Sequence, residues 1–445
     1  MKGKEVLLYG RLISRPAFIS LILLLNVAGF FYYIYYFNKQ GYLPSPFIYD
    51  KSDTFMDLFN VLYWAYDEGR YIEWGAVYPP LSFLIVRGWN FLLMGGGLGD
   101  PANMREGSLG LILSFLLIYL TLPILVLRLR QWQEFSLIQK ILIYFAVVLS
   151  APMLFSLERG NLIIFCPLIL ALGTSTVGTP RAFYIALLIN FKPYFAILMI
   201  YYLARRNWRG FVSCAAIAGM IFLATGLAMD DNFLVFFGNL LSFSKEETLF
   251  SLREVLALPS SVSVFSYVLG HPEGAAFAAE VVTAETIFRF IAVIETIKWL
   301  VLGLSVASVF FKNTALRDGE IFAILVVAIS NLGIWVGGYT FILYLALVPV
   351  LIKMQKKRVY MLYIFLLAIP LDLILILNES IGLQYSYLAD ESIEIFWQLG
   401  AGSFIRPGIN LLFLLTLTYE FAFKVKKPKA ECFLEKHPAS SPRAF

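Results

Sequence analysis

Six carboxylates lie close together between Tyr42 and Leu92, among aromatic side chains and directly after the first long apolar segment. They are Asp50, Asp53, Asp57, Asp67, Glu68 and Glu73. Carboxylates near lipid are costly unless they face water, a partner or a substrate, so this stretch is the first candidate for a functional site. One such carboxylate could act as a general base that takes the proton from a hydroxyl group. The simpler alternative is a solvated loop whose acids keep it out of the bilayer.

Asp53 and Asp57 begin a pattern of apolar residues at helical spacing, which continues to Tyr66. The pattern predicts a short amphipathic helix on the membrane surface, with both carboxylates on one face. We favour Asp53 as the base, because it lies closest to the point where the preceding helix reaches the bilayer surface. The positive end of the helix would also keep Asp53 ionised. Asp53 could instead only cap the helix, which would leave Asp57 as the base.

Cationic and polar side chains recur further along the chain, between apolar segments. Glu158, Arg159 and Asn161 separate two apolar helices, and Lys192 stands in the middle of an apolar segment, directly before Pro193. An isolated lysine at membrane depth usually has a partner or borders a cavity. Cations in such places could hold a phosphate group as negative charge develops on it.

Composition decides the class of protein that must position these residues. The chain has 445 residues, of which 60% are apolar and only 15% are charged. In the absence of strand alternation, this composition predicts an α-helical membrane protein with several spans. The net charge of +5 does not indicate nucleic-acid binding, because Lys and Arg occur in short clusters between apolar runs, as the positive-inside rule requires. Three cysteines and two histidines suggest neither a disulfide framework nor a metal site.

We expect a single all-α membrane domain over residues 1–423, with about 11–12 transmembrane or re-entrant helices, and a basic cytoplasmic tail over residues 424–445. Extracytoplasmic loops are expected at 38–107, which carries the surface helices, at 230–285, whose short helices pack over the first loop, and at 378–403. The long apolar segments lie near 16–37, 108–127, 137–155, 182–203, 210–229, 287–311, 320–336, 339–352, 359–377 and 404–423.

Residues 81–94 decide between two topologies, because this segment is short for a span. If it does not cross, Pro193 splits residues 182–203 into two half-helices that meet near Lys192. If it does cross, residues 182–203 form one kinked span. We favour the first topology, because it places the arginine clusters inside, both termini in the cytoplasm of a plasma (inner) membrane protein, and the candidate site outside.

The order of five short motifs resembles glycosyltransferase family 87. They are Asp53-Thr-Phe-Met-Asp57, Tyr78-Pro79-Pro80-Leu81, Arg159-Gly160-Asn161, Lys192-Pro193 and Arg205-Arg206-Asn207-Trp208-Arg209. The similarity spans residues 45–210, and beyond them only the helix count supports it. The arrangement of one helix, an acidic outside loop and many spans also resembles the GT-C fold of lipid-sugar-dependent glycosyltransferases. One departure is that this chain offers two aspartates where the family needs one base.

The resemblance implies an inverting hexosyltransferase that moves a sugar such as mannose from a polyprenyl-phosphate donor to a lipid-linked or glycan acceptor. It implies no nucleotide, cofactor or obligatory metal, and the expected partners are the donor, the acceptor and the bilayer, without nucleic acid. Either Asp53 or Asp57 would be the base, and Arg159 and Lys192 would bind the donor phosphate. The expected substrate contacts are Glu158, Asn161, Tyr78, Trp64 and Trp74, although the aromatic residues could equally form an interfacial belt.

Two other classes of membrane protein remain open from the sequence. A polysaccharide polymerase or flippase should rely on arginines more than on clustered acids. A secondary transporter should place its ionisable groups at mid-membrane in broken helices, and Lys192-Pro193 is the only feature of that kind.

Overall fold

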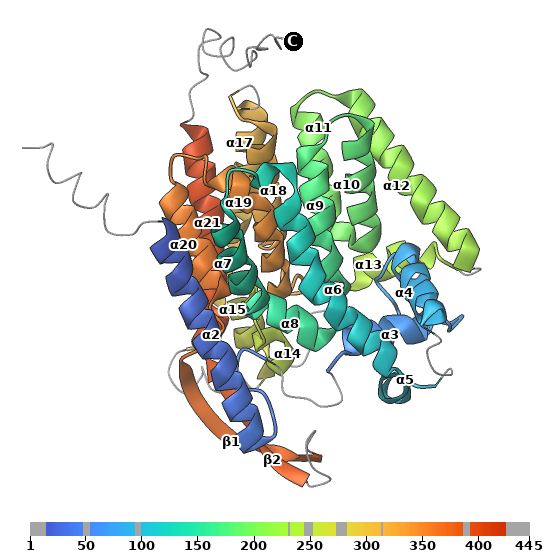
Figure 1. Cartoon of the computed structure of the whole chain (residues 1–445), viewed down its shortest axis with the longest axis vertical. Coiled ribbons are helices and arrows are strands. Elements are labelled where there is room, and N and C mark those ends of the chain that lie inside the picture. Colours follow the sequence, from blue (N-terminus) through green and yellow to red (C-terminus); the bar gives the residue numbers. More distant parts are fainter. Residues whose placement is uncertain are drawn as a thin grey trace, which may run out of the picture.

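The computed structural model describes residues 15–47, 54–93, 99–229, 232–243, 252–272, 283–312, 315–385 and 392–423, and most of this part of the chain is helical (Figure 1). The first helices are α2 (Arg15–Gln40), α3 (Met56–Trp64), α4 (Pro80–Leu92), α5 (Pro101–Gly107), α6 (Leu109–Arg128), α7 (Leu137–Val148), α8 (Ala151–Arg159), α9 (Cys166–Ser175), α10 (Thr179–Phe191), α11 (Ile200–Ala204) and α12 (Trp208–Met229). The later helices are α13 (Val235–Phe243), α14 (Leu252–Leu256), α15 (Ser263–Gly270), α17 (Ala284–Phe311), α18 (Asp318–Ile329), α19 (Tyr344–Leu351), α20 (Lys357–Ala368) and α21 (Gly402–Ala422). The 3₁₀ helices are η1 (Arg130–Trp132), η2 (Leu162–Phe165), η3 (Pro193–Met199) and η4 (Gly338–Leu343), and the strands are β1 (Ile374–Tyr385) and β2 (Ser392–Gly400).

The prediction of a helical membrane fold is confirmed. Within the described ranges, four helices are long and apolar enough to cross a membrane, or five if the bent pair α7–α8 is one span. The four are α2, α6, α12 and α17. Helix α4, which determines the choice between the two topologies, has 13 residues, well short of the roughly 20 that a straight span needs.

Prolines and glycines shorten several apolar segments that the sequence suggested as continuous helices. The segment predicted at 137–155 bends by 51° between α7 and α8, just before Pro152 at the start of α8. Three further apolar helices are only 10–17 residues long, namely Leu162–Ser175, Pro193–Ala204 and Gly338–Leu351. Each of the three begins with a 3₁₀ helix, directly after a polar or glycine-containing turn. The expected count of 11–12 therefore includes helices that are too short to cross a membrane alone.

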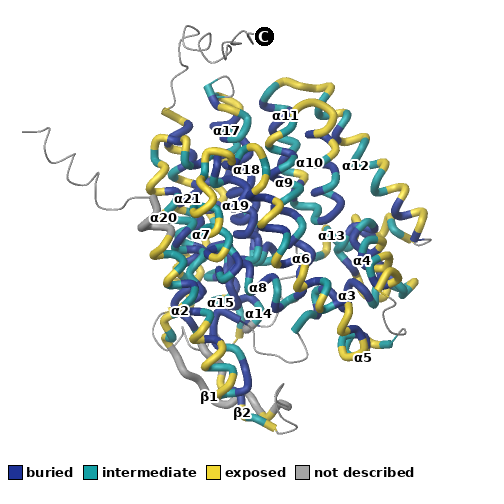
Figure 2. Tube along the Cα trace, viewed as in Figure 1, coloured by how far each residue is buried: buried dark blue, intermediate teal, exposed yellow. Residues whose placement is uncertain are grey.

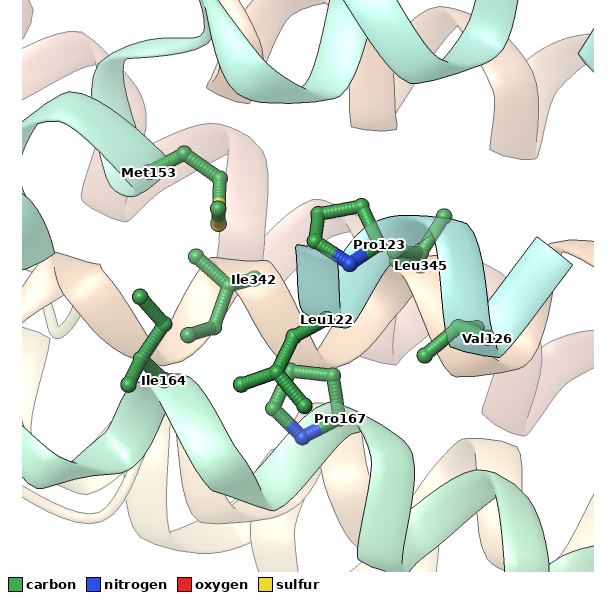
Figure 3. Close-up of a pocket in the computed structure, with 8 residues that line it drawn as sticks. All are labelled: Leu122, Pro123, Val126, Met153, Ile164, Pro167, Ile342 and Leu345. Atoms are coloured by element: carbon green, nitrogen blue, oxygen red, sulfur yellow. The ribbon is translucent and has the colours of Figure 1, made fainter. Parts of the chain in front are cut away.

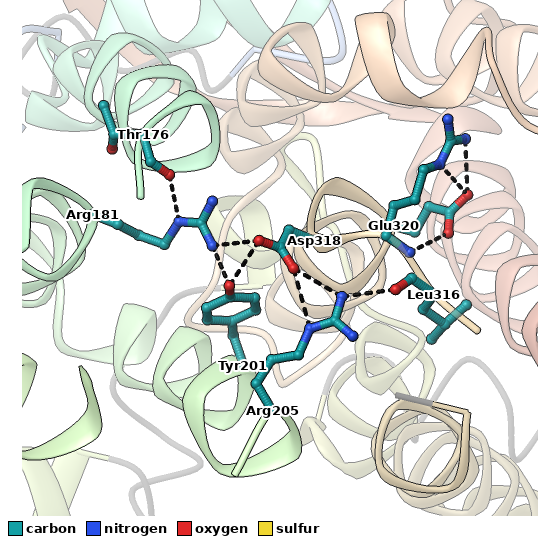
Figure 4. Close-up of polar contacts among 8 residues, drawn as sticks. Thr176, Arg181, Tyr201, Arg205, Leu316, Asp318 and Glu320 are labelled. Carbon is teal, nitrogen blue, oxygen red and sulfur yellow. Dashed lines mark hydrogen bonds and ion pairs between the residues drawn. The ribbon is translucent and has the colours of Figure 1, made fainter. Parts of the chain in front are cut away.

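Helix α10 and the segment η3–α11 form a hairpin whose tip is Lys192. Arg181 near the start of α10 and Arg205 after the end of α11 bind the same carboxylate, that of Asp318, at 2.7 and 2.8 Å (Figure 4). Arg181 also donates to the hydroxyl of Tyr201 (Figure 4). Because the start of α10 and the end of α11 both lie beside Asp318, the chain must turn back at Lys192, as the preferred topology predicts. The two half-helices are thus present as predicted.

The segment predicted as the third outside loop, residues 378–403, contains an antiparallel β-hairpin instead. Strands β1 and β2 pair from Ile374 opposite Gly400 to Tyr385 opposite Ser392. Helix α20 stops at Ala368, earlier than the predicted end at residue 377, because Pro370 cannot continue a helix. The hairpin lies beside the end of α2, at the end of the molecule opposite the last turns of α21 (Figure 1).

Helix α3 occupies the position predicted for a surface helix, but its apolar side is buried in protein. Leu58, Phe59, Val61 and Leu62 have no exposed surface. They pack against α4, α5 and α8, so the first loop forms a small folded layer of its own at the lower right of the molecule (Figure 2). The charge-rich tail at 424–445 lies outside the described residues.

Candidate functional site

Helix α3 is fixed by the turn that follows α8. The backbone N–H of Phe55 donates to the carbonyl of Glu158 at 2.8 Å, and the hydroxyl of Thr54 donates to the carboxylate of Glu158 at 3.3 Å. Gly160 has φ +64°, and a Cβ at this position would meet the Cβ of Leu58 at 2.9 Å. A glycine is therefore needed here both for the backbone conformation and for the close approach of α3.

The carboxylate of Asp57, in the first turn of α3, binds both polar residues of this turn. Arg159 donates to Oδ1 at 3.1 Å and the amide of Asn161 donates to Oδ2 at 2.6 Å. Asn161 is itself held by the backbone N–H of Ile163, which donates to its side-chain oxygen at 2.9 Å. The side chain of Asp57 remains 20% exposed, so a substrate hydroxyl could still reach it.

Lys192 completes the cluster from the tip of the α10–η3 hairpin. Its Nζ lies 4.0 Å from the centre of the Tyr78 ring, a cation–π contact. The hydroxyl of Ser82, near the start of α4, donates to the carbonyl of Phe191 at 3.3 Å and so holds α4 against this tip. The Tyr78 ring also contacts that of Trp64, at 6.4 Å between centroids. Trp64 lies two helical turns after Asp57, on the same face of α3.

Burial raises the pKa of the Asp57 carboxyl above its ordinary value, although the positive charge of Lys192 and the hydrogen bond from Asn161 act in the opposite direction. The negative charge of Glu254, on α14 in the second loop, adds to the increase. A carboxylate with a raised pKa is a stronger base, while the nearby cations keep it available in its ionised form.

The structure brings together six of the predicted site residues, namely Asp57, Trp64, Tyr78, Arg159, Asn161 and Lys192. Glu158 lies beside them but is buried against the chain that precedes α3, so it positions Asp57. Trp74 is half exposed and donates to the carboxylate of Asp67, which lies after the end of α3 and not beside Asp57. Asp53, the aspartate that the sequence analysis favoured, lies outside the described residues.

The sequence analysis missed three residues of this region: Tyr194, Glu254 and Tyr339. The phenol of Tyr339 lies within reach of the charges of Asp57 and Arg159. Its ring stacks on Phe155 of α8, and the preceding Gly338 donates its N–H to the carbonyl of Leu258 in the second loop at 2.7 Å. The pair Gly337-Gly338 separates two apolar segments, and this break was the sequence signal that could have pointed to Tyr339. The second loop thus contacts the segment that carries Tyr339, and its Glu254 is close enough to act electrostatically on Asp57 in the first loop.

The cavity in Figure 3 is a separate feature, buried among α6, α8, η2, α9, η4 and α19. Its volume is about 10 Å³ and the side chains that line it are apolar. It is too small for a substrate. In the part of the chain that the structure describes, no three His, Cys, Asp or Glu side chains are grouped in a way that could hold a metal ion.

Comparison with known protein families gives a match over much of the chain. The model of glycosyltransferase family 87 matches residues 77–332, which is more than half of the chain. The chain belongs to glycosyltransferase family 87. It is therefore a membrane glycosyltransferase with a sugar donor and an acceptor, and the flippase and transporter alternatives are set aside. No curated protein and no solved structure matches significantly.

The family match covers the cationic half of the site and extends beyond the residues on which the resemblance was first based. It includes Tyr78, Arg159, Asn161 and Lys192, and it continues to the end of α18. Asp57 precedes the matched segment, so its place in the site rests on the contacts with Arg159 and Asn161.

Proposed function

We propose that this enzyme transfers a hexose such as mannose from a polyprenyl-phosphate donor to a hydroxyl of a lipid-linked or glycan acceptor, with inversion at the anomeric carbon. The observation that carries the proposal is the joint position of one carboxylate, Asp57, and two cations, Arg159 and Lys192. A transfer of this kind needs a base for the acceptor and positive charge for the phosphate, and it needs no general acid, because phosphate is already a good leaving group.

In the proposed reaction, the acceptor oxygen attacks C1 of the donor sugar from the face opposite the phosphate. The acceptor proton passes to a free lone pair of the Asp57 carboxylate as the new C–O bond forms. The bond between C1 and the phosphate oxygen breaks, and its electron pair stays on the released polyprenyl phosphate. Arg159 and Lys192 stabilise the negative charge that develops on this phosphate. Tyr78 and Trp64 offer their aromatic faces to the sugar ring.

We further propose that the site faces the extracytoplasmic side. Arg181 and Arg205 lie at the end of the α10–η3–α11 hairpin opposite Lys192, and Arg206 and Arg209 follow Arg205 directly. Clusters of arginine favour the cytoplasmic side of a membrane, so Lys192 and Asp57 belong on the other side. A polyprenyl-phosphate donor would then reach the site with its lipid chain in the bilayer.

The test is a comparison of Asp57→Asn with Asp53→Asn. Asparagine keeps the hydrogen-bond acceptor for Asn161 but cannot take a proton at neutral pH. Asp57→Asn should express normally and lose transfer by a factor of roughly 10² or more, measured with a polyprenyl-phosphate sugar and a lipid extract as the acceptor source. Asp53→Asn should retain activity, because the proposal assigns the proton transfer to Asp57 and the N-cap of α3 is Phe55. If Asp57→Asn is active and Asp53→Asn is inactive, the base is Asp53. If both variants are fully active, the proposed mechanism is wrong.

A further inference from the structure

Two hydrogen-bond donors at the tip of the α10–η3 hairpin have no protein acceptor among the described residues. The hydroxyl oxygen of Tyr194 is buried, and no described residue bonds to it. The Nζ of Lys192 makes no hydrogen bond or ion pair with any residue that the structure describes, and it lies over the Tyr78 ring instead. The two donors belong to residues separated only by Pro193.

Both donors border the same region of the site. Cys166, at the start of α9, is close enough to act electrostatically on Lys192 and on Tyr194. Tyr78 lies against Lys192 and also within reach of the Tyr194 phenol. Lys192 is also within electrostatic reach of Asp57, so Tyr194 shares two neighbours, Cys166 and Tyr78, with a residue of the site.

A buried donor without an acceptor needs an explanation, because most buried polar groups in native proteins are hydrogen-bonded. The hydroxyls of Tyr33 and Tyr202 are also buried without a partner among the described residues, so this feature alone identifies no ligand site. Tyr194 differs from them because it lies two residues after Lys192, whose ammonium group also lacks an acceptor among the described residues. A phosphate offers several acceptor oxygens, so a single ligand of this kind could accept hydrogen bonds from both the ammonium and the phenol.

We propose that the hydroxyl of Tyr194 donates a hydrogen bond to the phosphate of the lipid-linked donor, beside Lys192. The inference rests on the proposed function, in which the donor carries its sugar on a lipid phosphate. As the bond from C1 to the phosphate oxygen breaks, negative charge grows on the phosphate and the hydrogen bond from Tyr194 strengthens. Tyr194 thus binds the donor and also stabilises the leaving group.

The test compares Tyr194→Phe with Tyr202→Phe in the full-length protein. Each variant removes one buried hydroxyl without a described partner, but Tyr202 lies in α11, at the opposite end of the hairpin. Binding of polyprenyl phosphate is measured against binding of the uncharged polyprenol, and kcat and KM are measured with the sugar-bearing donor. Tyr194→Phe should bind polyprenyl phosphate about tenfold or more weakly, which is the loss expected for one hydrogen bond to a charged group. Its affinity for polyprenol, and both affinities of Tyr202→Phe, should stay as in the wild type.

Two results would overturn the inference while leaving the proposed function in place. In the first, Tyr194→Phe binds polyprenyl phosphate as tightly as the wild type does. In the second, it loses affinity only for the sugar-bearing donor, which would assign the hydroxyl to the sugar. If the wild-type protein does not prefer polyprenyl phosphate over polyprenol, the proposed donor itself is wrong and the inference falls with it.

Discussion

The guanidinium of Arg159 and the carboxylate of Asp57 form a 3.1 Å ion pair across 102 residues of sequence. Both side chains are partly buried, at 12% and 20% exposed, so neither charge is fully solvated. A partly buried pair of this kind is a costly way to join two helices, since apolar packing would do so without desolvating charges. Its place between α3 and α8, with Lys192 close to Asp57, suits a site where a substrate phosphate engages Arg159 and an acceptor hydroxyl engages Asp57.

Removal of either cation should reduce transfer severely without unfolding the protein. We expect Arg159→Ala and Lys192→Ala each to lose about 2–4 kcal/mol of transition-state stabilisation, or roughly 10²–10³ in kcat/KM, because in the proposed reaction each cation faces the developing phosphate charge in a poorly solvated site. Lys192→Arg should restore only part of the rate, since a planar guanidinium cannot replace a compact ammonium over the Tyr78 ring. Arg87→Ala, which removes an exposed cation from α4, is the control and should keep its activity. Wild-type rates for both site variants would exclude these residues from the site.

Gly160→Ala should destabilise the packing of α3 against α8. The new methyl group would sit 2.9 Å from the Cβ of Leu58 in a backbone conformation with φ +64°. Gly75→Ala is the control, because Gly75 also has a positive φ, of +57°, but nothing lies within 4 Å of a Cβ there. Both variants carry the cost of an alanine at positive φ, about 1–2 kcal/mol, and only Gly160→Ala adds a clash. Thermal unfolding should therefore show a lower Tm for Gly160→Ala than for Gly75→Ala, and equal Tm values would mean that α3 can move away from the new methyl group at little cost.

Part of this site could be predicted from the sequence and part could not. Lys192 and the Arg159-Gly160-Asn161 turn stood out because charged side chains are rare in apolar segments. Tyr194 and Tyr339 carried no such signal, since tyrosine is common throughout the chain and only the break at Gly337-Gly338 marked one of them. The β-hairpin was missed because its first strand continues an apolar segment that suits a helix equally well. Short apolar runs do not distinguish helix from strand by periodicity.

The pH dependence of transfer should report the raised pKa of Asp57. Because burial disfavours the ionised carboxylate, the base becomes protonated at a higher pH than an ordinary aspartate, whose pKa is about 4. The rate should thus fall as the pH is lowered through this raised value. The folded protein also binds this proton more tightly than the unfolded chain does, so the free energy of unfolding should decrease as the pH rises through the same range. Asp57→Asn should lack this component of the stability profile, and an identical profile in wild type and variant would show that Asp57 does not titrate there.

The membrane orientation can be tested with single cysteines at exposed positions on the two sides of the molecule. Glu73 lies in the acidic first loop and Arg206 follows the hairpin leg that binds Asp318, and both are exposed. Native Cys166 and Cys214 are buried, and Cys432 is replaced by serine to remove the tail thiol. In intact cells, an impermeant thiol reagent should label Glu73→Cys and should label Arg206→Cys only after the membrane is permeabilised, because the arginine clusters belong in the cytoplasm. Labelling of Arg206→Cys in intact cells would show that the orientation is the opposite one, with Lys192 and Asp57 on the cytoplasmic side.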